Sequence, residues 1–447
     1  MIGKSMFSAL LAGSAFVGSA PAIAQQVQPS PPSSAAAPGD GAHAKIEMLE
    51  AQIKALQDSI EALKTQVAAT APAWKGAPQF ADKESGWSFK PRGRLMYDFG
   101  HVSSPDGFDN AGLGFSNEVR RARLGVEGTM PGDLGYRFEI DAAAGEVEIV
   151  DAFLTYAPAD IEFTLGQHNN FQSLEEVTSS LHTSFIERAA FTDAFGFERR
   201  VGLSAQYSKG PLLLQGGVFT DNIADLNAVG DDNDSYGFDT RAVYMPKMGE
   251  NQLHFAASYH WRDINDAGTS VRYRQRPAIH TTDVRFIDTG NLEGAKTETG
   301  YGVEAAGIFG PFHVASEAYW QEVGRETDLG DASFFGAYVE AGFFLTGESR
   351  GYKAGKFDRV KVKRPFGAGG IGAVSVNARW DYLDLTDGDI LGGKQNAYQV
   401  SLNWKPTDYV LFGLNYGRIN YDGALATPEG DRSYTVDMVG LRSQIDF

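Results

Sequence analysis

Residues 89–99 read Phe-Lys-Pro-Arg-Gly-Arg-Leu-Met-Tyr-Asp-Phe, and this stretch decides the fold class. Positions 89, 93, 95, 97 and 99 hold Phe, Gly, Leu, Tyr and Phe, whereas the even positions are mostly charged (Lys90, Arg92, Arg94 and Asp98). A period of two is typical of a β-strand with one apolar and one polar face. Sustained over about ten residues, it is the pattern that a membrane-spanning strand requires.

The same alternation recurs along the chain, for example in residues 136–142, 253–262 and 439–446. Strands of soluble sandwiches also alternate, but they average about five or six residues. We count sixteen segments, centred near residues 93, 122, 138, 152, 163, 204, 215, 240, 257, 304, 317, 340, 377, 399, 414 and 440. The sequence therefore predicts an all-β fold, a sixteen-stranded antiparallel transmembrane β-barrel over residues 86–447.

The expected connections alternate in length, as short periplasmic turns and long outer loops do. The short ones are residues 131–134, 157–160, 209–211, 246–251, 310–311 and 405–408. The long ones are residues 102–115, 168–198, 221–235, 263–299, 323–333, 386–393 and 422–432. Two connections fit this pattern poorly, because the outer one at 145–146 is short and the inner one at 346–370 is long.

Composition agrees with a barrel and excludes several other classes. The 447 residues include 52 Gly, 29 Phe and 18 Tyr, so Gly reaches about 12% against a usual 7% or so. The absence of Cys excludes disulfides and thiolate metal sites. A net charge of −18 argues against a nucleic-acid partner. Beyond the N-terminus no apolar run approaches the roughly 18 residues of a membrane helix.

Four segments are expected before the barrel. Residues 1–24 have a basic start at Lys4, an apolar middle and a small-x-small site at 22–24, which indicates a secretory signal peptide. Residues 25–42 are rich in Pro, Ala and Ser, which favours a disordered linker. Residues 43–68 are predicted to form a coiled coil in the periplasm, followed by a second linker at 69–85.

The coiled coil is predicted from apolar residues spaced alternately three and four apart. They are Ile46, Leu49, Ile53, Leu56, Ile60, Leu63 and Val67. So short a helix is marginal alone, so partner helices are implied. A helix packing on its own domain is the alternative, although such helices usually show a wider apolar stripe. β-Branched residues at a with Leu at d nominally favour a dimer.

Cations gather on the face of the strands that is expected to line the lumen. In a water-filled pore they raise the local anion concentration, and the guanidinium fork suits oxyanions. The predicted anion pathway consists of Lys90, Arg92, Arg94, Arg121, Arg123, Arg137, Arg241, Arg262, Arg379 and Arg442. The negative total would then belong largely to outer loops, with acids such as Asp221, Asp225, Asp231, Asp232 and Asp234.

A structural interpretation of these cations stays open beside the functional one. Barrel interiors also hold networks in which arginines and carboxylates only satisfy each other. The carboxylates available at the same parity are Glu127, Glu139, Asp141, Asp151, Glu304, Glu317 and Glu340. Sequence alone leaves both interpretations in place.

The body of the chain resembles the phosphate-selective porin O and P family of outer-membrane channels. The resemblance is carried in order by 120–124 with Gly128, by 166–188, by Phe-Leu-Thr-Gly-Glu at 344–348, by 379–385 and by the terminal 441–447. It implies a homotrimeric, anion-favouring channel in the outer membrane of a Gram-negative bacterium. It also implies that the third loop narrows the lumen.

Between residues 168 and 208 the cations are Arg188, Arg199 and Arg200, and there is no Lys. Because phosphate selectivity in the family is associated with lysines as well, another or a more general anion is equally compatible. A further basic cluster lies in the long inner connection. It either donates hydrogen bonds to anions at the periplasmic mouth or forms a solvated face. Its members are Lys353, Lys356, Arg359, Lys361, Lys363 and Arg364.

The functional prediction is passive diffusion of small anions, with phosphate or polyphosphate among the candidates, and no enzyme activity. Partners are expected to be outer-membrane lipid, other copies of the chain, small anions and the barrel-assembly machinery, which would recognise the terminal Phe447. No cofactor, metal site or nucleic acid is expected. The alternatives are an envelope tether that uses the coiled coil, and a non-selective or neutral-solute porin.

Overall fold

The structure is a computed structural model that describes residues 40–70, 72–82, 84–108, 112–143, 145–226, 235–264, 271–326 and 328–447. The predicted signal peptide, most of the first linker and the acids at 231–234 lie outside the described residues. The chain divides into two units, residues 1–69 and residues 70–447.

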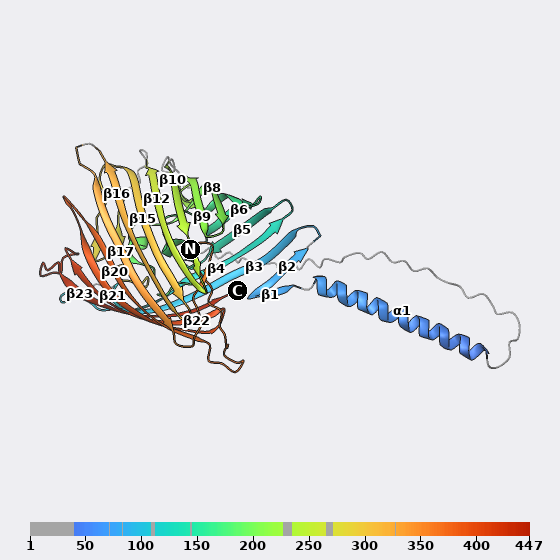
Figure 1. The fold of residues 1–447 in the computed structure, drawn as a ribbon. Coiled ribbons are helices and arrows are strands. Elements are labelled where there is room, and N and C mark those ends of the chain that lie inside the picture. Colours follow the sequence, from blue (N-terminus) through green and yellow to red (C-terminus); the bar gives the residue numbers. More distant parts are fainter. Residues whose placement is uncertain are drawn as a thin grey trace, which may run out of the picture. The chain divides into compact units, whose positions relative to one another are not determined.

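Sixteen strands of the second unit form a closed antiparallel barrel, so the predicted fold class is confirmed (Figure 1). Each contacts its neighbour in chain order, and β23 returns to β3, with Leu441 opposite Phe99. Every predicted strand centre falls within an observed strand. The strands are β3 Trp87–Val102, β4 Gly114–Met130, β5 Leu134–Asp141, β6 Glu148–Tyr156, β7 Ile161–Asn169, β8 Arg199–Lys209, β9 Leu212–Phe219, β10 Tyr236–Tyr244, β12 Asn251–Asp263, β15 Ala295–Phe309, β16 Phe312–Arg325, β17 Ala332–Phe344, β20 Ala373–Asp387, β21 Ile390–Thr407, β22 Val410–Asp422 and β23 Tyr434–Asp446.

Alternating side chains divide each strand between lipid and lumen. In β22, Phe412, Leu414 and Tyr416 face outward and are exposed, whereas Asn415 and Ile419 have the opposite parity and are buried. Because successive residues of a strand point to opposite faces, the period of two in the sequence becomes an apolar outer surface.

The connections differ between the two ends of the barrel. At what we call the short-turn end they are residues 131–133, 157–160, 210–211, 245–250, 310–311, 345–372 and 408–409. At the long-loop end they are residues 103–113, 142–147, 170–198, 220–235, 264–294, 326–331, 388–389 and 423–433. The small elements in them are β11 Lys247–Met248 and α4 Ile223–Leu226.

The predicted long outer loop at 386–393 is wrong. β20 and β21 continue beyond the expected ends and are joined by residues 388–389 alone, with Gly388 in the left-handed region at a φ of 54°. The strands extend because Leu383 and Leu385 are buried inside the barrel at this end. Apolar contacts with the loops inside thus outweigh the local turn-forming residues.

Three connections fold into the barrel rather than away from it. The third loop, residues 170–198, contains α2 Leu174–Val177 and α3 Ala190–Ala194, and Ala190 N donates to Asp381 on the far wall at 2.9 Å. The fifth loop, residues 264–294, contains β13 Arg274–Gln275 and β14 Ile287–Asp288.

From the short-turn end comes the inner hairpin, residues 345–372, with β18 Gly351–Lys353 and β19 Lys356–Asp358. Its Arg350 donates to Glu340 on the wall and to Ser184 of the third loop at 2.7 and 2.6 Å. Loops therefore enter the lumen from both ends and meet there.

The apolar core lies inside the barrel, between the third and fifth loops and the strands that they cover. The ring of Phe191 in α3 stacks on Tyr319, with ring centroids 5.8 Å apart. Phe286 of the fifth loop packs on Tyr421 at 5.0 Å. These contacts fill part of the lumen, so the open passage lies elsewhere in it.

The segment before the barrel is more ordered than a linker. Residues 69–85 contain β1 Ala73–Lys75 and β2 Ala77–Asp82, and β2 pairs with the start of β3. This pairing satisfies backbone groups at the beginning of β3, which the expected linker would have left open.

The N-terminal helix α1 spans Asp40–Thr70, beginning three residues before the predicted coiled coil. Its apolar seam is exposed, between 47% for Leu49 and 62% for Leu56. Val67 lies outside the described side chains, and pairing of the seam with another helix stays a prediction. Among the described residues, no helix combines the length and apolar character needed to cross a bilayer.

Candidate functional site

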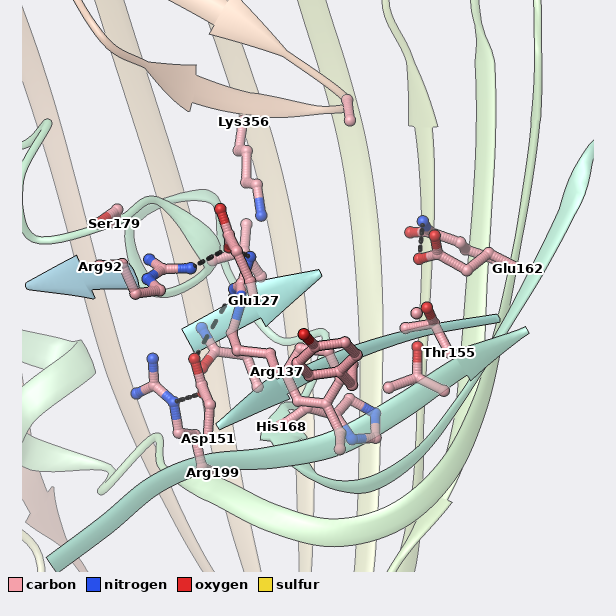
Figure 2. Close-up of a pocket in the computed structure, with 18 of the residues that line it drawn as sticks. Arg92, Glu127, Arg137, Asp151, Thr155, Glu162, His168, Ser179, Arg199 and Lys356 are labelled. Atoms are coloured by element: carbon pink, nitrogen blue, oxygen red, sulfur yellow. Dashed lines mark hydrogen bonds and ion pairs between the residues drawn. The ribbon is translucent and has the colours of Figure 1, made fainter. Parts of the chain in front are cut away.

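A cavity of about 700 Å³ opens between the wall of strands β3–β10, the third loop and the inner hairpin (Figure 2). Ten cations line it: Lys90, Arg92, Arg94, Arg121, Arg123, Arg137, Arg188, Arg199, Arg241 and Lys356. The carboxylates that line it are only Glu127, Asp151 and Glu162. Within the described residues the lining thus carries seven more positive than negative charges.

A second cavity, of about 280 Å³, lies between the third and fifth loops. It shares only Arg121, Ser180, Arg188 and Arg199 with the first cavity. These four residues therefore border the place where the two cavities meet. An ion that crosses from one cavity to the other passes three guanidiniums there.

A β-bulge in β4 places two neighbouring arginines in the lumen. Met96 pairs with Arg121 and the next residue, Tyr97, pairs with Val119, so Arg120 is the extra residue. A bulge sets two residues of one strand against one of its partner and re-aims side chains locally. Arg120 then reaches Glu187 of the third loop at 2.9 Å, while Arg121 lines both cavities.

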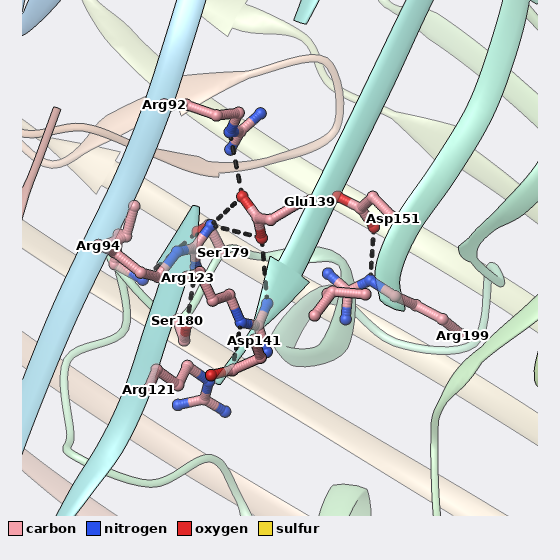
Figure 3. Close-up of polar contacts among 12 residues, drawn as sticks. Arg92, Arg94, Arg121, Arg123, Glu139, Asp141, Asp151, Ser179, Ser180 and Arg199 are labelled. Carbon is pink, nitrogen blue, oxygen red and sulfur yellow. Dashed lines mark hydrogen bonds and ion pairs between the residues drawn. The ribbon is translucent and has the colours of Figure 1, made fainter. Parts of the chain in front are cut away.

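Glu139 on β5 holds one side of the arginine wall together (Figure 3). Its carboxylate accepts from Arg123 Nη1 at 3.3 Å and from Arg94 Nη2 at 3.4 Å, and Arg92 Nε lies 3.1 Å from it. Arg123 also reaches Asp141 at 2.8 Å. Three guanidiniums thus share one buried carboxylate, and Arg92 has a second partner in Glu127, which it shares with Arg137.

Asp151 and Glu127 hold the next part of the wall. Arg199 Nε lies 2.6 Å from Asp151, and Arg137 Nη2 lies 2.9 Å from Glu127 (Figure 2). Arg137 also covers the ring of Phe153, with its guanidinium carbon 5.5 Å from the ring centroid. These pairs orient the guanidiniums toward the cavity instead of letting them fold against the strands.

Three of the ten cations have no carboxylate within ion-pair distance among the described residues. They are Lys90, Lys356 and Arg121, of which Arg121 has only a weak contact to Met96 Sδ at 3.8 Å. Including the paired carboxylates behind the wall (Glu139, Asp141, Glu176 and Glu304), ten cations still face seven anions. The positive excess therefore survives a full account of the ion pairs.

Lys356 at the start of β19 points from the inner hairpin into the cavity (Figure 2). Burial, followed by the positive charges of Arg137 and Arg241, lowers the pKa of Lys356. Repulsion by neighbouring guanidiniums is what a cavity with uncompensated positive charge produces.

Arg188 stabilises the third loop where the two cavities meet. Its Nε donates to the carbonyl of Glu175 at 2.8 Å, and Nη2 donates to the carbonyls of Glu176 and Thr178 at 3.1 and 2.9 Å. Nη1 lies 3.0 Å from a carboxylate oxygen of Glu176. The arginine thus both shapes the loop and lines both cavities.

The loop is anchored to the far wall by Glu317 on β16. Its carboxylate accepts from Ser173 Oγ at 2.7 Å and from the backbone N–H groups of Leu174 and Glu175 at 2.9 and 2.8 Å. On the near side, burial alone would raise the pKa of Glu187, but the charges of Arg120, Arg442 and Arg121 together hold that pKa well below its usual value. The third loop is therefore fixed on both sides of the lumen.

The remaining predicted cations lie in other surroundings. Arg379, with a fully buried side chain, pairs with Glu340 at 2.8 Å and with Glu175. Arg442 pairs with Asp98 at 2.6 Å, and Arg262 pairs with Glu298 at 3.3 Å. Arg200 is buried, 3.7 Å from Glu198. None of these four lines either cavity.

Some residues of the passage were not selected from the sequence. Arg120 has the outward parity if β4 is regular, and only the bulge turns it inward. Ser180 Oγ, from the third loop, accepts from Arg94 Nη1 at 3.2 Å. The run Arg120-Arg121 was a usable signal, because two adjacent charges cannot both face the lumen of a regular strand.

The terminal Phe447 closes the barrel seam. Its N–H donates to the carbonyl of Gly93 at 3.0 Å, and Gly93 N–H donates back at 3.2 Å. Its ring is exposed and also covers Gly93, where a Cβ would meet the ring at 2.4 Å. Recognition of this residue during assembly stays a prediction.

Comparison with known proteins gives a consistent result. A model described as phosphate-selective porin O and P matches residues 89–447. An uncharacterized protein of Caulobacter vibrioides is 47% identical over 393 residues, covering 86% of this chain and 78% of its own length. Porin O of Pseudomonas aeruginosa is 27% identical over 390 residues, covering 78% of this chain and 86% of its own.

Among solved structures, the anion-selective porin from Comamonas acidovorans shares the fold, with a TM-score of 0.52 at 12% identity. The similarity covers 81% of this chain and 100% of that chain.

Proposed function

This chain belongs to the phosphate-selective porin O and P family of outer-membrane channels, which are not enzymes, and on that premise we propose that it conducts small anions passively through the arginine-lined passage. The observation that carries the proposal is the excess of cations in the first cavity and at its junction with the second. A pore lined by one sign of charge concentrates counter-ions and lowers their entry barrier.

We divide the predicted cations into two groups and propose a different role for each. Arg379 and Arg442 lie in buried, closely matched ion pairs, and we assign them to holding the third loop in place. Lys90, Arg121 and Lys356 face the cavity without a carboxylate partner among the described residues, and we assign them to attracting anions. The structural and functional interpretations of the sequence thus apply to different residues.

We assign the inner hairpin a mixed role. Lys356 lines the first cavity and contributes to the anion passage, whereas Lys353, Lys361 and Arg364 line neither cavity. Arg359 pairs with Asp446 and fixes the hairpin to β23. We therefore assign one member of the basic cluster, Lys356, to binding anions, and most of the others to a solvated face.

Phosphate is a candidate solute because guanidiniums bind oxyanions bidentately. The place where the two cavities meet combines Arg121, Arg188 and Arg199 with the hydroxyl of Ser180, all of which can donate hydrogen bonds to an oxyanion. Chloride and small carboxylates meet the same field, so the proposal is a general anion preference.

Planar bilayers under a KCl gradient test the proposal on the purified full chain. The reversal potential of the wild type should have the sign for chloride, and added phosphate should reduce the chloride current. Substituting Lys90→Gln together with Lys356→Gln should lower the anion preference. The matched control, Lys353→Gln with Lys361→Gln, should leave it unchanged. A wild type that prefers potassium refutes the proposal.

A second candidate role, envelope tethering, is supported by the exposed apolar seam of α1. We propose that this helix lies in the periplasm and pairs with the helices of other copies in a homotrimer. Deleting residues 44–67 separates the two roles. Conductance that persists while envelope integrity fails favours tethering, and loss of the oligomer in detergent identifies the helix as its main contact.

A further inference from the structure

A separate group of arginines lies at the long-loop end of the barrel. Arg272, Arg274, Arg285 and Arg432 line a hollow of about 530 Å³ between the fifth loop and the ends of β21 and β22. It shares no lining residue with either cavity of the passage. This cluster is therefore a second basic site with its own surroundings.

The two carboxylates that line the hollow are already engaged. Asp288 accepts from Arg272 Nε at 2.8 Å, and Asp283 accepts from Arg276 Nη2 at 3.1 Å. Asp283 is also 96% exposed and hence strongly solvated. Neither carboxylate neutralises the remaining arginines.

Arg274, Arg285 and Arg432 have no carboxylate within ion-pair distance in the part of the chain that the structure describes. Arg285 Nη1 donates to the carbonyl of Asp283 at 3.2 Å, and its buried Nε has no hydrogen-bond partner. Arg432 Nη1 donates to the carbonyl of Ala424 at 3.2 Å. Three guanidiniums thus border one hollow with most of their donors free.

The hollow lies just beyond the lipid-facing surface. On β20 and β21 the outward residues include Trp380 and Tyr398, which are exposed aromatics of the kind that mark a membrane interface. Thr386 has the same outward orientation as Trp380 and Tyr382, because an even number of residues of β20 separates them. Leu391 pairs with Thr386 and therefore lies on the outward face too, four residues beyond the level of Tyr382. Four residues of a tilted strand correspond to about 10 Å of height. At the long-loop end, which is the outer end of such barrels, this is the level of lipid headgroups.

The hollow also offers apolar surface. Leu391 is 69% exposed at its edge, and Leu425 beside it is exposed as well. A small inorganic anion would gain no binding energy from contact with these apolar side chains. A phosphate group attached to an acyl-bearing lipid would place its charge among the guanidiniums and its apolar part against the leucines.

We propose that this hollow binds a phosphate group of the outer-leaflet glycolipid. The guanidinium forks of Arg274, Arg285 and Arg432 would donate to the phosphate oxygens, and Leu391 would contact the start of an acyl chain. The site rests on the membrane location of the barrel and not on its ion selectivity, so the proposal goes beyond the conduction of anions.

Binding of lipid A to the purified full chain in neutral detergent micelles tests this. The probes are diphosphorylated lipid A and the same lipid after enzymatic removal of its phosphates. Near an anionic surface each arginine contributes about fivefold in affinity, so the triple variant Arg274→Gln, Arg285→Gln, Arg432→Gln should bind lipid A about 100-fold more weakly. The dephosphorylated lipid should bind the wild type weakly and be insensitive to the substitutions.

The matched control removes three exposed cations at the short-turn end, Lys353→Gln, Lys361→Gln and Arg364→Gln, and should bind lipid A as the wild type does. The double variant Arg274→Gln, Arg432→Gln changes only exposed side chains, which guards against misfolding, and should bind about 25-fold more weakly.

Equal binding by the triple variant and the wild type overturns the proposal. So does displacement of lipid A by millimolar inorganic phosphate, because the hollow would then be a capture site for free anions. Reversal potentials of the triple variant should stay at the wild-type value. Failure here therefore leaves the anion channel untouched, and a cation-selective wild type leaves the lipid site untouched.

Discussion

Replacing Arg121 by Gln tests the central physical claim, that positive charge without an ion-pair partner at the junction of the two cavities sets ion selectivity. Arg121 lines both cavities, and no described carboxylate lies within ion-pair distance of it. Gln keeps a polar side chain that can hydrogen-bond and removes one positive charge. The fold should tolerate the change, because no buried ion pair is broken.

The magnitude follows from Coulomb's law. At about 4 Å a unit charge is worth about 1 kcal/mol in water and more in a less polar medium. Losing Arg121 would raise the barrier for chloride and lower that for potassium, each by about 1 kcal/mol. The ratio of chloride to potassium permeability should then fall by about 30-fold. In 1 M salt the Debye length is only about 3 Å, so the difference should shrink to a few-fold.

Reversal potentials in planar bilayers under KCl gradients centred near 0.1 M and near 1 M measure both ratios. Arg121→Lys retains the charge and should retain the selectivity. Arg418→Gln removes an arginine from the outward face of β22, where it lies 3.6 Å from Asp437, and should change nothing. An unchanged ratio for Arg121→Gln at low salt would refute the reasoning, since ions would then not sense charge at this position.

Three further predictions concern the third loop and the helix. Arg379→Ala leaves the buried carboxylates of Glu175 and Glu340 without their shared cation and should lower the free energy of unfolding by about 3–5 kcal/mol, measured by urea denaturation in lipid vesicles; a loss below 1 kcal/mol contradicts this. Burial lowers the pKa of His182 to about 3. Because the folded state then resists a proton that the unfolded chain accepts, stability should fall as pH drops from about 6.5 toward 3, by up to about 1.4 kcal/mol per pH unit. His182→Gln should flatten this pH dependence in the same assay, and an unaltered slope argues against the assignment. Ile53→Asp at the centre of the seam should dissociate the isolated helices and lower cross-linking between copies; cross-linking at the wild-type level means that the seam has no helical partner.

The fold could be predicted in detail because its signal is local. A strand needs only its own alternating residues to define two faces, and all sixteen centres could be located in this way. The long outer loop predicted at 386–393 shows the limit. Local turn-forming residues indicated a loop, whereas Leu383 and Leu385 are held in strand by apolar contacts with distant loops inside the barrel.

The candidate site could be predicted only as a set of inward-facing cations. Arg121 and Arg379 have the same predicted parity and look alike in the sequence. The third loop brings Glu175 to Arg379 across the lumen, although the two are 204 positions apart in the chain. Among the described residues it places no carboxylate within ion-pair distance of Arg121. Parity is a property of one strand, but neutralisation depends on which loop reaches which wall.

The sequence by itself determined the barrel and its two faces, because both follow from the repeat of two residues along a strand. Tertiary structure alone decided which positive charges stay free. The bulge in β4 turns the side chain of Arg120 into the lumen, and the third loop buries Arg379 in ion pairs. The inner hairpin places Lys356 in the cavity from the opposite end of the barrel. Selectivity depends on the charge that remains after pairing, and pairing is set by contacts between residues far apart in the chain.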